Sequence, residues 1–480
     1  MFARARLGGL ILGLAILLAP VASAKAAEPA KGAEPVLNLP QLEEMALKYS
    51  PVVKASRSEV TFAKEQKNEA RAYRWPQFDT TATGGVVPDA KLGEIREVPG
   101  RLFYPDPADK IHGVNIFGHL DYSLIQPLYT FGKIAFREEA AGHNVKVKEE
   151  AVASQQGETV VQVAQAYYGL ILANQGKEAV KEARSYLNDT RERVDRLLAM
   201  NSPNAKETDR YRLAAYEGAL EKSNAEAEEG SKTAYRALKA LIGYGENQDF
   251  QVSQDLPAPS APAGTLDTYI QTCLELRPEF KELKEGLAAR QLLVDAAKAD
   301  RLPSFFFAVV GELAGAPGRK YNPDPYINDY FNAYGALPMV GAKWHFDFGI
   351  LKAKVGQAQA ELEKLREDQR AALMAIPVEV AKSYGEVRQY WQSSVGMEKA
   401  YVNSRRWLVT SLNNFDMGLG KMDDIFQAFE RYGVFRGDYL MVLYQYNLSV
   451  AQLDKATGAY RRKLPAEGPA LKPASLPAPQ

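Results

Sequence analysis

An internal duplication constrains the fold of this 480-residue chain more than any other feature of its sequence. Four residues of the first half recur 227 residues later, namely Leu39, Pro51, Arg74 and Pro76 as Leu266, Pro278, Arg301 and Pro303. Further along the spacing becomes 217 residues, with Phe131-Gly132 recurring as Phe348-Gly349 and Met200 as Met417. Matches that keep their order over such a span indicate that one structural unit occurs twice. We therefore expect two structural repeats, 36–255 and 265–460, joined by the Pro- and Ala-rich linker 256–264.

Both halves contain the same order of predicted elements. Each begins with a helical stretch, continues with two strand-like segments around a loop, and ends in a very long helical pattern and a shorter returning helix. The expected helices are 40–72, 133–200, 205–243, 266–300, 350–417 and 422–459. At 1.5 Å per residue each long pattern would measure about 100 Å, far more than an average globular helix. Two shorter helices placed end to end, for example 205–243 and 266–300, would span a similar height.

The strand-like segments have the alternation of a sheet with one apolar face. In the segment 114–127, Val114, Ile116 and Leu120 share one face, while His119 and Asp121 fall on the other. A second alternating segment is expected at 334–348, and the partner strands 75–86 and 304–313 alternate less regularly. Such segments are long enough to cross a bilayer as tilted strands. A half-buried hairpin in a soluble sheet is the alternative for any one of them.

Four strands are too few to form a membrane barrel alone. Every backbone N–H and C=O group in lipid must be paired, so a sheet in the membrane must close on itself, and single-chain barrels begin at about eight strands. Three chains would supply twelve strands, an even number within the usual range. The sequence thus predicts a mainly α-helical fold of long helical hairpins, with four strands per chain in a shared transmembrane β-barrel.

The first and last segments have compositions of their own. Arg4 and Arg6 precede the apolar run 7–18, and Ala22-Ser23-Ala24 follows it, which is the pattern of a cleaved secretory signal peptide. The run is shorter than the ~20 residues of a membrane-spanning helix. We expect residues 1–24 to be a signal peptide. Residues 461–480 are rich in Pro and Ala, and we expect them to form a disordered tail.

The composition offers little material for catalysis or metal binding. The chain has one cysteine, Cys273, and four histidines. It contains no P-loop, HExxH or GxSxG pattern. Its formal net charge of zero argues against a nucleic-acid partner. We therefore expect no enzyme activity, no cofactor, no metal and no nucleic acid.

Three short motifs resemble those of a known family. The segment Gln126-Pro127-Leu128-Tyr129-Thr130-Phe131-Gly132 is similar to a QPL-aromatic-x-x-G junction between a strand and a helix. Arg74-x-Pro76 and Arg301-x-Pro303 are similar to the transition from helix to strand, and MGLGKMDDIFQA (417–428) to the second helical hairpin. In this order within a duplicated frame, they resemble the TolC family of outer-membrane efflux proteins over nearly the whole chain after the signal peptide.

The resemblance implies a homotrimer that forms a barrel in outer-membrane lipid and a helical tunnel through the periplasm. Such a duct docks through a periplasmic adaptor (membrane fusion protein) onto an inner-membrane RND or ABC transporter, as in tripartite efflux or type I secretion. Export through it is passive. A periplasmic coiled-coil scaffold or adaptor without a barrel is the alternative function.

The resemblance also implies functional residues. In the family, carboxylates near the tip form a ring at the closed periplasmic entrance, and Asp424 occupies the matching position. Gln427 stands where the family can have a second Asp, and Asp423 is the neighbouring carboxylate. The alternative for Asp424 is a favourable charge in the first turn of a helix.

Two further sets of residues complete the expected sites. Adaptor contacts or closing salt links are expected at the hairpin tips, at Asn201, Ser202, Pro203, Asn204, Lys206, Gly418, Gly420 and Lys421. The strand-to-helix junctions comprise Gln126, Pro127, Phe131, Gly132, Phe348 and Gly349. Their glycines are expected to allow a tight backbone turn.

Overall fold

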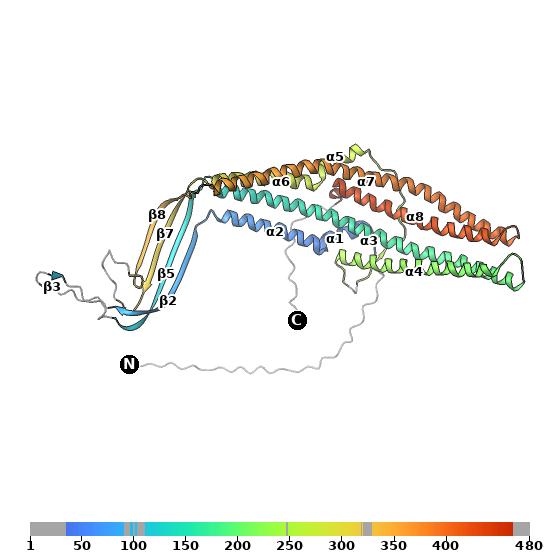
Figure 1. The fold of residues 1–480 in the computed structure, drawn as a ribbon, viewed down its shortest axis with the longest axis horizontal. Helices are drawn as coiled ribbons and strands as arrows, with labels where there is room; N and C mark the ends of the chain where they lie inside the picture. The colour runs from blue at the N-terminus through green and yellow to red at the C-terminus, as the bar shows by residue number, and fades with distance from the viewer. Residues whose placement is uncertain are drawn as a thin grey trace, which may run out of the picture.

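The computed structural model describes residues 35–90, 97–98, 101–102, 111–245, 248–317, 319 and 329–463. The molecule is elongated, with a sheet at one end and long helices that run from it to two hairpin tips (Figure 1). The expected signal peptide 1–24 lies outside the described residues, as do residues 464–480 of the expected tail. A short 3₁₀ helix, η2 (Ala459–Arg462), continues past residue 461, where the tail was expected to begin.

The two repeats contain helices of equal length. The first repeat has α1 (Leu39–Tyr49), α2 (Pro51–Ala72), α3 (Lys133–Ala199) and α4 (Glu207–Ile242). The second has α5 (Leu266–Leu276), α6 (Pro278–Ala299), α7 (Ile350–Asp416) and α8 (Met422–Thr457). Their lengths are 11, 22, 67 and 36 residues in each repeat. This equality confirms the duplication and the long hairpins.

Prolines divide the expected helices 40–72 and 266–300, but a proline inside the long helix of the second repeat does not divide it. The stretches expected at 40–72 and 266–300 are each two helices, with breaks before Pro51 and Pro278. Proline disfavours helical geometry at the residue before it and lacks an N–H donor, so it starts a new helix readily. Pro377 lies inside α7, which continues through it as a single helix.

Four long strands form one antiparallel sheet. They are β2 (Gln77–Ala90), β5 (Ile111–Tyr129), β7 (Ser304–Gly315) and β8 (Tyr334–Lys343), in the order β2-β5-β7-β8. The central pairing of β5 with β7 therefore joins the two repeats. Among the described residues β2 and β8 each have a strand partner on one side only, so the sheet of one chain is open.

The last strand is shorter than expected. It ends at Lys343, so Trp344, Phe346 and Phe348 lie beyond it. The Asp347 carboxylate accepts hydrogen bonds from the backbone N–H groups of Gly349, at 2.8 Å, and Leu351, at 3.1 Å. These bonds occupy donors at the start of α7 that have no partner within the helix. The chain before α7 thus turns to cap a helix and does not extend the strand.

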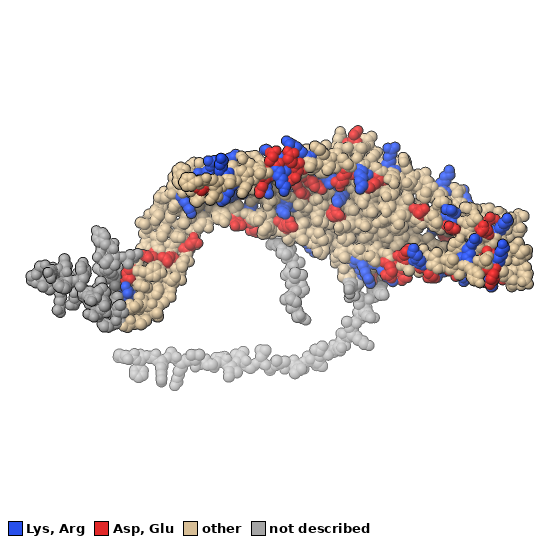
Figure 2. All heavy atoms as spheres, in the orientation of Figure 1, with Lys and Arg blue, Asp and Glu red and all other residues tan. Residues whose placement is uncertain are grey.

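Cross-strand register gives the sheet two different faces. On one face Leu120 lies opposite Ala82 of β2 and Leu313 of β7. On the other, Asp121 lies opposite Thr81 and Glu312. The alternation expected for β5 is confirmed. Figure 2 shows charged side chains over the helical body, whereas the sheet carries few of them.

Two pairs of two-residue strands were not expected. Strand β1 (Val36–Leu37) pairs in parallel with β6 (Gln251–Val252), and β3 (Glu97–Val98) pairs with β4 (Arg101–Leu102). The first pairing joins the start of the first repeat to its end. Strands of two residues are too short for a recognisable alternation.

Each long helix packs beside shorter helices of its own repeat. Helix α3 contacts α1, α2 and α4, and α7 contacts α5, α6 and α8. Helix α4 meets α1, and α8 meets α5. The shorter helices that meet end to end therefore belong to the same repeat. The sequence-based example, which placed 205–243 of the first repeat end to end with 266–300 of the second, was wrong. No helix among the described residues is both long enough and apolar enough to cross a membrane.

Candidate functional site

The strand-to-helix junction is stabilised in the same way in both repeats. The Gln126 side-chain amide donates to the backbone carbonyl of Arg74 at 2.9 Å and to that of Pro127 at 2.7 Å. In the second repeat the indole N–H of Trp344 donates to the carbonyl of Arg301 at 3.0 Å. Arg74 and Arg301 are equivalent residues at the ends of the short helices. A side chain next to the junction thus holds the neighbouring helix end in each repeat.

The backbone of the first junction requires a glycine. Phe131 and Gly132 have φ angles of +53° and +87°, in the left-handed region that non-glycine residues rarely adopt. A Cβ at position 132 would lie 2.6 Å from the Phe136 ring, so that ring would also have to shift. In the second junction Phe348 is fully exposed and Gly349 is the N-cap of α7. Backbone N–H donation from Gly349 lowers the pKa of the Asp347 carboxyl.

Contacts between the repeats reinforce the junction. The Lys133 ammonium donates to the Leu302 carbonyl at 2.6 Å and to the Ser304 hydroxyl oxygen at 2.8 Å. Its burial lowers its pKa. Arg137 forms an ion pair with Asp300 at 2.6 Å. No local sequence pattern reveals these partners, because they lie more than 160 residues apart.

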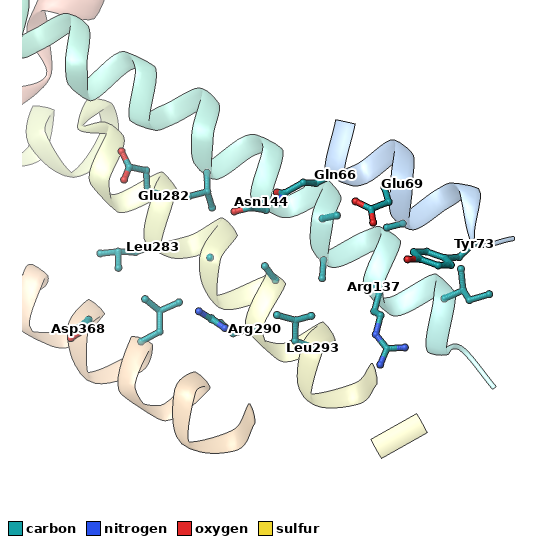
Figure 3. Close-up of a pocket in the computed structure, with 18 of the residues that line it drawn as sticks. Gln66, Glu69, Tyr73, Arg137, Asn144, Glu282, Leu283, Arg290, Leu293 and Asp368 are labelled. Atoms are coloured by element: carbon teal, nitrogen blue, oxygen red, sulfur yellow. The ribbon is translucent and has the colours of Figure 1, made fainter. Parts of the chain in front are cut away.

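A cavity of about 1200 Å³ lies below the junction, among α2, α3, α6 and α7. Figure 3 shows Gln66 on α2 and Tyr73 directly after it, Asn144 on α3, Leu283 on α6 and Asp368 on α7 around it. Its lining is mostly apolar, with several charged side chains. Glu282 also lines it, and burial together with the nearby Glu279 and Glu150 raises the pKa of Glu282 to about 7.

The first hairpin tip is a short exposed loop. Asn201 has a φ of +51°, and Ser202 accepts a hydrogen bond from the N–H of Asn204 at 3.3 Å through its hydroxyl. Pro203 follows in the loop, and its side chain is exposed. Lys206 precedes α4, and its N–H donates to the Asp209 carboxylate at 2.9 Å. The Asp209 side chain therefore caps the helix.

The second tip turns on glycine. Gly418 has a φ of +75°, and a Cβ at Gly420 would lie 3.0 Å from the Phe415 nitrogen. The N–H of Lys421 donates to the Asp424 carboxylate at 3.1 Å, which repeats the cap of the first tip. Asp424 is exposed. In one chain its carboxylate thus has the helix-start role that the sequence offered as the alternative to an entrance ring.

Asp423 connects the two hairpins. Its carboxylate lies 2.7 Å from Arg212 on α4 and accepts a hydrogen bond from Gln427 at 2.7 Å. These two partners lower the pKa of Asp423, Arg212 more than Gln427. Asp423 and Gln427, both predicted near the entrance, are therefore brought together with Arg212, which no local sequence pattern indicates.

A second ion pair joins the long helices near the tips. Arg193 on α3 contacts both carboxylate oxygens of Asp416 on α7, at 2.8 and 3.0 Å. The guanidinium lowers the pKa of Asp416. A shared apolar core packs nearby between the hairpins; its buried members include Leu187, Val194, Leu213, Leu408, Ile425, Phe426 and Tyr432. No sequence signal identifies these pairs, because Arg and Asp are common on exposed helix faces.

Comparison with solved structures identifies the fold. The chain is 17% identical to the outer-membrane channel OprN, with a TM-score of 0.69 over 88% of this chain and 89% of that one. It is 19% identical to the CmeC outer membrane channel of Campylobacter jejuni, with a TM-score of 0.67 over 93% and 94% of the two chains. For the outer membrane protein VceC of Vibrio cholerae the values are 18%, 0.67, 88% and 96%.

No family model and no curated protein matches the sequence. The fold therefore rests on the structural matches, which extend over most of both chains. Each matched protein is described as an outer-membrane protein or channel. The chain has the fold of outer-membrane channels, as its resemblance to the TolC family predicts.

Proposed function

We propose that three copies of this chain form a passive export duct in the outer membrane. The observation that carries the proposal is the exposed apolar face of an open sheet. Phe78, Val86, Val114 and Ile116 are 62% to 74% exposed in the single chain and share this face. Contiguous exposed apolar surface marks a site of contact with protein or membrane. On a sheet with an opposite polar face, it suits contact with lipid.

The two free edges of the sheet support this assembly. Backbone groups on the outer sides of β2 and β8 would have no partner in lipid, where water cannot satisfy them. Pairing β2 of one chain with β8 of the next removes both edges. Three chains then give a closed barrel of twelve strands. Its polar face, which carries Asp121 and Glu312, would line the channel.

The helices would continue the barrel as a tunnel. Each 67-residue helix measures about 100 Å, and both hairpin tips lie at the end opposite the sheet. We place the tips in the periplasm, where they would contact a periplasmic adaptor and an inner-membrane RND or ABC transporter. Tripartite efflux and type I secretion both fit such a duct. A passive duct needs no catalytic residues, and so we propose no enzyme activity.

Cysteine cross-linking between the sheet edges tests this proposal. Asp79 on β2 and Leu337 on β8 lie on the polar face, at opposite ends of one row across Ser123 and Val310. In a Cys273→Ser background, Asp79→Cys is combined with Leu337→Cys or Met339→Cys. Oxidation of outer-membrane fractions should give covalent trimers. Asp79→Cys with Ser123→Cys is the matched control, since these neighbours would link within one chain.

The two candidate functions differ in the outcome. A barrel predicts edge-to-edge links and a trimer that dissociates in detergent only on heating. A monomer that fractionates with soluble periplasmic proteins and forms no links between chains would instead support the scaffold function.

A further inference from the structure

Three side chains that can bind a metal meet on the polar face of the sheet. His119 and Asp121 belong to β5, and Glu312 belongs to β7. His119 Nε2 lies 3.0 Å from Asp121 Oδ1 and 3.7 Å from Glu312 Oε2. One potential ligand atom of each residue lies within 4.8 Å of the others. The His119 side chain is fully buried, while those of Asp121 and Glu312 are 55% and 32% exposed.

The contact of the other ring nitrogen, Nδ1, determines whether Nε2 of His119 carries a hydrogen or a free lone pair. Nδ1 lies 2.7 Å from the backbone carbonyl oxygen of Tyr330. A carbonyl only accepts, so we assign the hydrogen to Nδ1, which donates it. The Tyr330 ring stacks on the imidazole with centroids 4.1 Å apart and an angle of 11° between the planes, which holds the ring in place. In the neutral ring, Nε2 then presents a lone pair.

This orientation places three acceptors against one another. A lone pair on Nε2 directed at two carboxylates is unfavourable unless a positive charge lies between them. That charge is either a proton on Nε2 or a cation. Metal-binding histidines commonly donate their second N–H to a backbone carbonyl, which fixes the tautomer, and His119 has this arrangement.

We propose that His119, Asp121 and Glu312 form a site for a divalent transition-metal ion of the Zn²⁺ class. One imidazole nitrogen and two carboxylate oxygens are ligands that Zn²⁺ accepts, with a fourth position for water. Zinc–ligand distances of about 2.0–2.2 Å require the carboxylates to approach the ion. Both are partly exposed and on neighbouring strands, so side-chain rotation suffices.

The bound ion would anchor a segment that crosses the polar face. Phe331 packs against Phe117 with centroids 4.9 Å apart, and Asp329 pairs with Arg319 at 3.2 Å. Tyr330 and Thr83 share a hydrogen bond of 3.3 Å between their hydroxyl groups. Because the Tyr330 carbonyl holds His119, a metal on His119 would connect segment 329–333 to both repeats. In the proposed channel this segment would lie at the inner wall of the barrel.

A second histidine provides a matched comparison. His143 Nδ1 lies 2.6 Å from Glu285, and Lys146 lies 3.2 Å from the same carboxylate oxygen. This group has one carboxylate, and a lysine already neutralises it. It therefore lacks the excess of negative acceptors found at His119, and we expect no metal there.

Direct zinc binding by the purified full chain, free of any histidine tag, tests the proposal. Equilibrium dialysis against Zn²⁺, with bound metal counted by mass spectrometry, should give one ion per chain. The double variant Asp121→Asn/Glu312→Gln and the variant His119→Gln should each weaken binding at least about tenfold. His143→Gln should bind as the native protein does. Circular dichroism verifies that each variant has folded.

Two results would overturn the metal site. Native protein that binds no Zn²⁺ would identify the cluster as a protonated histidine paired with carboxylates. Binding that survives in the folded Asp121→Asn/Glu312→Gln variant would place the metal elsewhere. The site lies within one chain, so its failure is separable from that of the channel. A trimer without zinc would refute only the site, and a monomer that binds zinc would refute only the duct.

Discussion

The two repeats have the same framework but different charges where their hairpins meet. Arg193 and Arg212 belong to the first repeat, and their partners Asp416 and Asp423 to the second. Aligning α3 with α7 and α4 with α8 from their first residues gives the equivalent positions. The equivalents of Arg193, Arg212, Asp416 and Asp423 are, in that order, Thr410, Gln427, Ala199 and Thr208, and none of them is charged. The apolar pattern that sets helix length is thus retained in both repeats, while surface charge has diverged. The contact between the two hairpins therefore has arginines on the side of the first repeat and aspartates on the side of the second.

The comparison of the two repeats can be tested first at the C-terminal ends of α4 and α8. Gly243 and Gly458 end α4 and α8 with φ angles of +72° and +73°. A Cβ at Gly243 would lie 3.0 Å from the Tyr49 side chain, whereas at Gly458 it would lie 2.9 Å from the backbone of Leu276 and Arg277. We expect Gly243→Ala to lower the free energy of unfolding by about 1–2 kcal/mol. Gly458→Ala should cost about 3 kcal/mol, because the backbone cannot move aside.

Denaturant unfolding of the purified variants measures this difference. Equal losses at the two positions would show that the helix ends are packed alike in spite of their different neighbours.

A carboxylate in the second repeat gives the next largest effect. Glu282 is equivalent to Ala55, which is exposed, but it lines the cavity among four helices (Figure 3). Its pKa is raised to about 7, mainly by burial, from about 4.3 in an unfolded chain. Between these values the folded state binds more protons, so stability should fall as pH rises. Glu282→Gln should weaken this dependence and stabilise the protein by about 1–2 kcal/mol at pH 8. The remainder is expected from Glu43, because burial raises its pKa to about 7 as well.

Melting temperatures measured from pH 5 to pH 8 test this prediction. Ala55→Glu is the reciprocal control and should leave the pH profile unchanged, because its side chain would be exposed. A native-like pH profile in Glu282→Gln would show that another group is responsible.

The charged contacts at the tips should give the smallest effect on stability. Arg193 and Arg212 lower the pKa values of Asp416 and Asp423. Their contribution is therefore complete above the unfolded value of about 3.9 and is lost as pH falls through the lower folded values. Both pairs are intact at neutral pH. Exposed ion pairs contribute little to overall stability, so Asp416→Asn/Asp423→Asn should barely change the melting temperature.

Hydrogen exchange at the tips is the sensitive measurement. At pH 7 the double variant should exchange amide hydrogens faster than the native protein in 190–215 and 410–430. Below about pH 4 the two should approach each other. Thr208→Asn changes the residue equivalent to Asp423 and should leave exchange unaltered. Unchanged exchange in the double variant at pH 7 would mean that the apolar core alone holds the hairpins together.

Much of the framework could be predicted because periodic patterns report local geometry. The 67-residue helices and the alternation in β5 follow from the spacing of apolar residues. The boundaries were less predictable. The apolar residues Trp344 and Phe346 continue the alternation of β8, yet the hydrogen bonds of Asp347 commit that segment to the start of a helix.

The sequence by itself determined the duplication, the order of the helical stretches, the lengths of the four hairpin helices, and the apolar and polar faces of the sheet. Only the tertiary structure decided which polar groups meet: Asp423 with Arg212, Lys133 with Ser304, and His119 with Glu312. The physical reason is that apolar periodicity records a local orientation relative to the core. A charged residue on an exposed face has many possible partners, and only the packing of distant helices and strands selects one.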